Sequence, residues 1–150
     1  MLDKAVQSVL KPAFTWAAKG AVKAGLSANA VSVIGFVVGI AAAAAIAVQS
    51  YALGAVLILL SRTFDGIDGT VARMTGATDQ GGFLDISLDF LFYAAIPLAF
   101  AFANPAVNSL AAASLLAAFI GTGSTFLAFA AFAEKRRMHS SNLPDKSFYF

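Results

Sequence analysis

Four aspartates lie close together in a chain that is otherwise rich in apolar residues. Asp65 and Asp68 belong to one short segment, and Asp85 and Asp89 belong to the next. A charged side chain at the centre of a membrane helix costs roughly 2.5–3.5 kcal/mol even on the lenient insertion scale. A cluster of four acids therefore requires a cation, and hard carboxylate oxygens suit Mg²⁺ or Mn²⁺, with Ca²⁺ as an alternative occupant.

The spacing of the aspartates predicts a shared pocket. Asp65 and Asp68 are three residues apart, and Asp85 and Asp89 are four apart, so each pair lies on one face of a helix. We expect the two helices to run antiparallel through a short connection, which lets the acidic faces meet. Without a cation the carboxylates would repel one another.

The residues around the acids fit phosphate chemistry. Gly66, Gly69 and Ala72 carry little or no side chain, so a bulky ligand can approach the backbone. Arg73 supplies a cation for a phosphate, and Arg62 either does the same or anchors to lipid headgroups. Two arginines cannot neutralise four acids, so internal charge pairing does not account for the cluster. Metal ions that bridge a diphosphate are a standard route to substitution at phosphorus.

The composition places these acids in a membrane protein. Hydrophobic residues make up 59% of the 150-residue chain, and the mean hydropathy is +0.80. Charged residues make up 12%, whereas soluble domains carry about 25%. The length fits one domain, and the absence of cysteine excludes disulfides and thiolate metal sites. A soluble fold is therefore excluded, and we expect no nucleic-acid partner.

Four apolar stretches predict an all-α, polytopic membrane helix bundle. A membrane helix needs about 20 residues. The four predicted transmembrane helices are residues 31–48, 51–64, 84–103 and 107–132.

The charges predict how the bundle is oriented. If the chain crosses the membrane four times, all ten basic residues and all the acids fall on one side of the membrane. The two turns on the other side, at residues 49–50 and 104–105, carry no charge. The positive-inside rule places the charged side in the cytoplasm. We therefore expect a multi-pass protein of the inner membrane whose termini and aspartates are cytoplasmic.

Residues 1–24 predict an amphipathic juxtamembrane helix that lies on the inner membrane surface, interrupted near Pro12, with Trp16 as an interface anchor. Residues 25–150 then form the transmembrane domain. The aromatic run at 147–150 is typical of the start of another membrane segment. We therefore expect that the chain stops short of its natural end.

The acidic segment resembles the signature of the CDP-alcohol phosphotransferases, also called CDP-alcohol phosphatidyltransferases. That pattern is D-x2-D-G-x2-A-R followed by G-x3-D-x3-D. The first half matches from Asp65 to Arg73, and the second half matches from Gly81 to Asp89. The spacer of seven residues, 74–80, is one shorter than in the family pattern. The family usually has six membrane helices and forms homodimers, whereas four spans are counted here.

The resemblance implies a reaction and a role for each matching residue. Such enzymes move a substituted phosphate from a CDP-linked donor, often CDP-diacylglycerol, to a small or lipid alcohol and release CMP, as in phospholipid biosynthesis. One or two Mg²⁺ or Mn²⁺ ions would be held by Asp65, Asp68, Asp85 and Asp89, and Asp89 would also be the catalytic base. Residues implied to contact the donor are Gly69, Ala72, Arg73, Gly81 and Asn29, the last because it keeps the asparagine of the family's Thr-Pro-Asn segment.

The acceptor and two other functions stay open. The basic residues Lys135, Arg136 and Arg137 fit either anchoring on anionic lipid or an acceptor pocket for an anionic alcohol. An intramembrane prenyltransferase also grips diphosphate through aspartate-bound metal, but its acidic motifs normally lie in two separated segments. A cation or proton transporter should place its acids near the bilayer midplane, whereas these acids are predicted at the cytoplasmic end.

Overall fold

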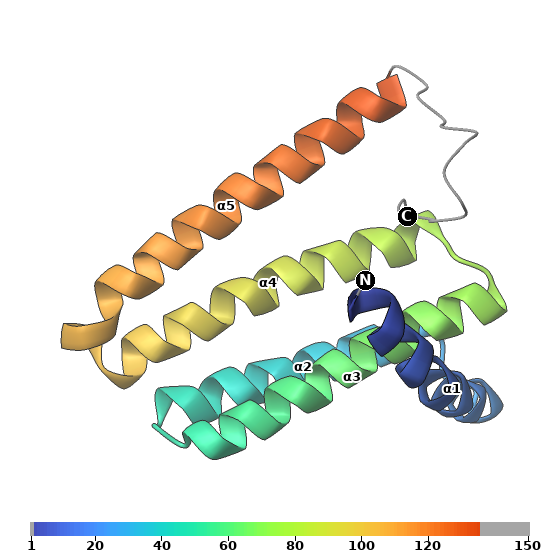
Figure 1. Cartoon of the computed structure of the whole chain (residues 1–150), viewed down its shortest axis with the longest axis horizontal. Helices are drawn as coiled ribbons and strands as arrows, with labels where there is room; N and C mark the ends of the chain where they lie inside the picture. Colours follow the sequence, from blue (N-terminus) through green and yellow to red (C-terminus); the bar gives the residue numbers. More distant parts are fainter. Residues whose placement is uncertain (1, 136–150) are drawn as a thin grey trace.

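The computed structural model describes the backbone of residues 2–135 and the side chains of residues 11–133. The described chain is all helical, as the sequence predicts (Figure 1). Its five helices, in chain order, are α1 (Leu2–Lys23), α2 (Ala28–Ala47), α3 (Tyr51–Thr75), α4 (Asp79–Ala103) and α5 (Pro105–Lys135).

The centre of the bundle is α2, which packs against both α3 and α4. Small residues allow this close approach, because a Cβ added at Gly35 would lie 2.8 Å from Cβ of Phe64, and one added at Gly39 would lie 2.6 Å from the Phe92 ring. The Ser61 hydroxyl donates to the Gly35 carbonyl at 2.8 Å, and this hydrogen bond joins α3 to α2 beside the contact between Gly35 and Phe64. Glycine at these positions therefore sets the spacing of the three helices.

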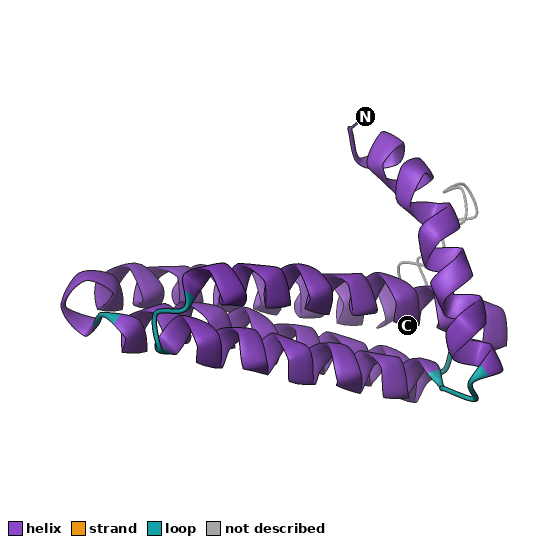
Figure 2. Cartoon of the chain, turned by 90° about the horizontal axis from the view of Figure 1, so that it is seen from below, coloured by secondary structure: helices purple, strands orange, loops and turns teal. Residues whose placement is uncertain are grey.

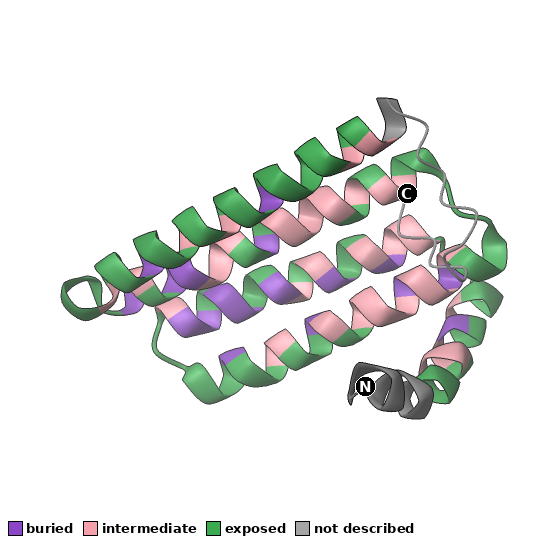
Figure 3. Ribbon diagram, turned by 45° about the horizontal axis from the view of Figure 1, so that its top comes forward, coloured by how far each residue is buried: buried purple, intermediate pink, exposed green. Residues whose placement is uncertain are grey.

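Within the described part of the chain, the outermost helix, α5, packs mainly along α4. Gly123 of α5 lies directly against the Phe90 ring, because a small residue lets the two helices approach closely. Most of α5 is exposed, whereas the buried residues gather where α2, α3 and α4 meet (Figure 3). Exposed Leu110, Ile120 and Phe132 show that this surface is apolar, as expected of a helix in lipid.

Three helices, α2, α4 and α5, are long and apolar enough to cross a membrane by length and composition. The fourth predicted span, residues 51–64, lies in α3, which is not among them. Its apolar stretch of 14 residues covers about 21 Å, short of the roughly 30 Å of a hydrocarbon core. That stretch already contains Arg62, and the other charged residues of α3 follow it, so this helix combines an apolar first part with a charged second part.

The two uncharged turns lie together at the end of the bundle opposite the α3–α4 connection (Figure 1). The Gln49 side chain, in the α2–α3 turn, donates through Nε2 to the Ala103 carbonyl at 2.8 Å. This contact ties the α2–α3 hairpin to the α4–α5 hairpin. The expected separation of charged and uncharged ends is thus present, although the membrane orientation itself stays a prediction.

The first helix crosses the charged end of the bundle at a steep angle (Figure 2). The expected interruption near Pro12 is wrong, because α1 continues through that residue. A proline inside a helix removes one backbone hydrogen bond but does not always end the helix. Phe14 and the fully buried Ala18 face the bundle, whereas Trp16 is 81% exposed. The predicted interface anchor is therefore free of the bundle, and its contact with lipid stays a prediction.

Replacing Gly35 with alanine should lower the thermal unfolding midpoint of the protein in detergent. The added methyl would meet Cβ of Phe64, which cannot rotate away, and overpacking of this kind costs about 1–3 kcal/mol. Gly121→Ala is the matched control, because nothing lies within 4 Å of a Cβ added at that position and alanine favours a helix. Equal midpoints for the two variants would contradict the close packing of α2 on α3.

Candidate active site

A tight connection brings the two acidic helix faces together. Helix α3 ends before Gly76, whose φ of 102° is a conformation that glycine adopts readily. Helix α4 then begins with Thr78 as its cap, the side-chain oxygen accepting from the backbone N–H of Gly81 at 3.1 Å. The chain therefore reverses direction within three residues, and the antiparallel arrangement expected from the sequence is observed.

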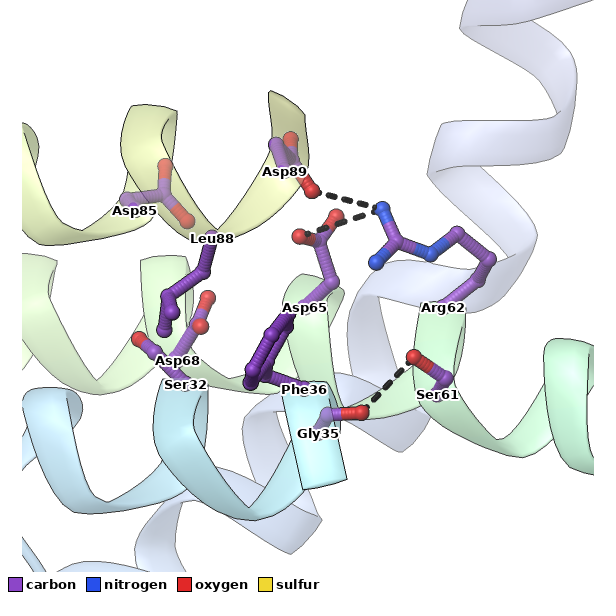
Figure 4. Close-up of a pocket in the computed structure, with 10 residues that line it drawn as sticks. All are labelled: Ser32, Gly35, Phe36, Ser61, Arg62, Asp65, Asp68, Asp85, Leu88 and Asp89. Atoms are coloured by element: carbon purple, nitrogen blue, oxygen red, sulfur yellow. Dashed lines mark hydrogen bonds and ion pairs between the residues drawn. The ribbon is translucent and has the colours of Figure 1, made fainter. Parts of the chain in front are cut away.

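Three of the four predicted metal ligands converge. Asp65, Asp68 and Asp85 each offer a carboxylate oxygen, and these oxygens all lie within 4.8 Å of one another (Figure 4). Two ligands of one ion can be separated by at most twice the metal–oxygen distance, about 4.2 Å for Mg²⁺ and about 5 Å for Ca²⁺. Asp68 is only 5% exposed. The bound of 4.8 Å is within the limit for Ca²⁺ and slightly above that for Mg²⁺, so the group is close enough to share a single hard divalent cation.

The fourth aspartate, Asp89, instead contacts Arg62. Nη1 of Arg62 lies 2.8 Å from Oδ1 of Asp89 and 3.5 Å from Oδ1 of Asp65 (Figure 4). The sequence analysis suggested a phosphate or lipid contact for Arg62 and set internal charge pairing aside, whereas the structure pairs Arg62 with two of the acids. The available signal was the i, i+3 spacing of Arg62 and Asp65, which puts both on one face of α3.

Two adjoining cavities meet at the acids. The smaller, of about 10 Å³, is lined by all four aspartates together with Arg62. The larger, of about 470 Å³, falls within the usual range of small-molecule sites. Asp68 and Asp85 line both. A ligand in the larger cavity would therefore lie directly beside the group that can hold a cation.

Every residue that the sequence assigned to donor binding lines the larger cavity: Asn29, Gly69, Ala72, Arg73 and Gly81. Nη2 of Arg73 donates to the Thr70 hydroxyl at 3.0 Å, which holds the guanidinium near the cavity. A Cβ added at Gly81 would lie 3.0 Å from Oδ1 of Asn29, so glycine lets the start of α4 approach the start of α2.

Other expectations have different outcomes. Gly66 does not leave room for a ligand, because the Phe14 ring would lie only 2.7 Å from a Cβ added there. Ser32 and Phe126 also line the larger cavity and were missed. Ser32 follows Asn29 by three residues on one helix face, whereas no spacing in the sequence links Phe126 to the acids. The basic residues are untested, because the Lys135 side chain, Arg136 and Arg137 lie outside the described residues.

Replacing Asp68 with asparagine should weaken Mn²⁺ binding by more than about tenfold, because a buried ligand of the group is lost. Calorimetric titration of the purified protein with Mn²⁺ measures the affinity. Asp79→Asn is the matched control, since Asp79 is exposed at the start of α4 and is not part of the group. Equal affinity in the wild type and the Asp68→Asn variant would rule out the ion site.

Comparison with known proteins gives independent evidence of the family to which the chain belongs. The chain is 45% identical over all its 150 residues to Inner membrane protein YnjF of Escherichia coli (strain K12), covering 73% of that protein. It is 33% identical over 73 residues to archaetidylinositol phosphate synthase of Pyrococcus horikoshii, covering 48% of this chain and 39% of that protein. No solved structure matches the chain. The model of the CDP-alcohol phosphatidyltransferase family matches residues 26–146. The protein is therefore a member of the CDP-alcohol phosphatidyltransferase family of membrane transferases, as its aspartate motif predicted.

Proposed function

We propose that the protein transfers a phosphatidyl group from CDP-diacylglycerol, or a similar CDP-alcohol, to the hydroxyl of an alcohol and releases CMP. The observation that carries this proposal is the 470 Å³ cavity, which shares Asp68 and Asp85 with the acidic cluster. A nucleotide in that cavity has its diphosphate beside the acids. The family and the relative named as archaetidylinositol phosphate synthase support a role in phospholipid biosynthesis.

The residues of the cavity bind and orient the donor. Gly69 and Ala72 carry little or no side chain, so the nucleotide can approach the backbone of α3. Asn29 offers an amide for a polar contact with the nucleotide. Arg73 provides a charged donor for a phosphate oxygen. Asp65, Asp68 and Asp85 would hold Mg²⁺ or Mn²⁺, which would supply positive charge for the donor diphosphate.

Asp89 takes the proton of the acceptor. The acceptor oxygen forms a bond to the phosphorus, the bond from that phosphorus to the oxygen of CMP breaks, and the hydroxyl proton passes to Asp89. Arg62 engages Oδ1 of Asp89, so we assign the proton to Oδ2. The arrangement keeps the base within the cavity that contains the cation ligands.

The structure of α3 supports a reaction at the membrane surface. Its apolar part ends before Arg62, so the acids lie in the half of α3 nearer the α3–α4 connection, away from the uncharged turns. We propose that this end faces the cytoplasm, because the positive-inside rule favours it. The lipid chains of the donor then lie along the exposed apolar helices while the diphosphate reaches the acids. A homodimer stays a prediction from the family resemblance.

The two alternatives are less consistent with the observed arrangement. All four aspartates lie on one helical hairpin, whereas prenyltransferase motifs lie on separate segments. A transporter needs acids along a path through the bilayer, whereas these acids are confined to the halves of α3 and α4 that adjoin their connection. Neither alternative explains why the signature glycines and Ala72 line one cavity with the acids.

Purified protein with CDP-diacylglycerol and a panel of alcohols, including glycerol phosphate, serine and inositol phosphate, should release CMP only when Mg²⁺ or Mn²⁺ is present. The reaction needs both the donor diphosphate and the cation held by the acids. Chromatography of CMP and of the lipid products measures turnover and identifies the acceptor. Undiminished CMP release in excess chelator would rule out the role given to the acids.

Replacing Asp89 with asparagine should reduce turnover by about 10²–10⁴-fold and leave Mn²⁺ and CDP binding close to wild type, because only the proton acceptor is lost. Steady-state CMP release and titration with CDP separate the two effects. Asp65→Asn is the comparison variant and should weaken binding as well. A loss of CDP binding in Asp89→Asn equal to that in Asp65→Asn would refute a separate role for Asp89.

A further inference from the structure

Thr70 lies between a backbone carbonyl of α3 and the arginine of the donor cavity. Its hydroxyl donates to the Gly66 carbonyl at 2.9 Å and accepts from Nη2 of Arg73 at 3.0 Å. A threonine hydroxyl has a single proton to donate. Because that proton goes to Gly66, the oxygen turns its lone pairs outward, and it can serve Arg73 as an acceptor.

Helix geometry explains why the Arg73 side chain reaches this hydroxyl. Long side chains on a helix point back toward its N-terminus, over the residues three and four positions earlier. For Arg73 these residues are Thr70 and Gly69. Nη1 of Arg73 lies 3.5 Å from a Cβ added at Gly69, so the guanidinium lies over this turn. The positive charge is thereby directed toward the part of α3 that carries Asp68, a residue common to both cavities.

The other end of this pair of hydrogen bonds lies in a packed part of the bundle. The Phe14 ring of α1 would lie 2.7 Å from a Cβ added at Gly66, so α1 packs directly against this residue. The carbonyl that orients the Thr70 hydroxyl is therefore held in place. Arg73 itself is exposed, and an exposed arginine has many rotamers to choose from. The bond to Thr70 selects one of them.

Thr70 itself does not line the donor cavity, whereas its neighbours Gly69, Ala72 and Arg73 do. An effect of Thr70 on the donor would consequently pass through Arg73. The family signature D-x2-D-G-x2-A-R leaves the position of Thr70 open, so the motif does not assign it a role.

We propose that Thr70 is a positioning residue of the donor site, whose hydroxyl holds the Arg73 guanidinium over the cavity for a phosphate oxygen of the donor. The inference rests on the proposed function and extends its site by one residue. Holding the arginine before the donor arrives lowers the entropy that is lost on binding.

Calorimetric titration of the purified full chain with CDP, in detergent micelles containing Mn²⁺, measures the effect. Thr70→Val keeps the shape of the side chain and removes the hydroxyl. It should weaken CDP binding about three- to tenfold, because a hydrogen bond to a charged group is lost at an exposed site. Thr70→Ser keeps the hydroxyl and should bind CDP as the wild type does.

Two further variants separate positioning from a general loss of stability. Thr63→Val is the matched control, since the Thr63 hydroxyl also donates to a carbonyl of α3, that of Leu59 at 2.8 Å, but lies outside both cavities. It should bind CDP as the wild type does. In an Arg73→Gln background, Thr70→Val should cause no further loss, because the group that Thr70 positions is absent.

Two results would overturn the inference and leave the proposed function intact: wild-type CDP affinity in a folded Thr70→Val variant, or additive losses from Thr70→Val and Arg73→Gln. If Thr70→Val does not fold, Thr70→Ala takes its place, because alanine also lacks the hydroxyl and favours a helix. No CDP binding by the wild type would instead contradict the proposed function itself.

Discussion

The mutual repulsion of carboxylates within an apolar bundle is the constraint on which the rest of this structure depends. Asp65, Asp68 and Asp85 bring oxygens within 4.8 Å of one another, and Asp68 is almost fully buried. Such a group is costly unless a cation occupies it. Arg62 meets only part of this need, since it contacts Asp65 and Asp89. In the function we propose, a divalent ion would complete the charge balance and make the cluster able to bind a diphosphate donor.

The helices maintain this costly arrangement through close packing. Gly35 and Gly39 let α3 and α4 approach α2, and the buried hydroxyl of Ser61 joins two of the three helices. The short loop at Gly76 fixes how α4 returns alongside α3. Gly81 lets the start of α4 approach α2, and because it has no side chain it also leaves space in the cavity next to the acids. Packing and ligand space are therefore two consequences of one pattern of small residues.

Much of the site could be predicted, because helical periodicity and short loops are local properties. The spacing of Asp65 and Asp68 placed them on one face, and the family motif named five residues that line one cavity. Properties that depend on tertiary contacts were missed. Gly66 accommodates Phe14 from a helix distant in sequence, and Arg62 is held by Phe92 and Asp89 from α4. No local pattern specifies such partners, nor whether a helix continues through a proline.

The most direct test of the central claim is an anomalous difference map from crystals of the protein grown with Mn²⁺ and CDP. We expect a strong peak among the carboxylates of Asp65, Asp68 and Asp85, with the CDP diphosphate against it and the nucleoside in the cavity lined by Gly69 and Gly81. A map with CDP bound elsewhere, or with no peak between these three side chains, would contradict the account.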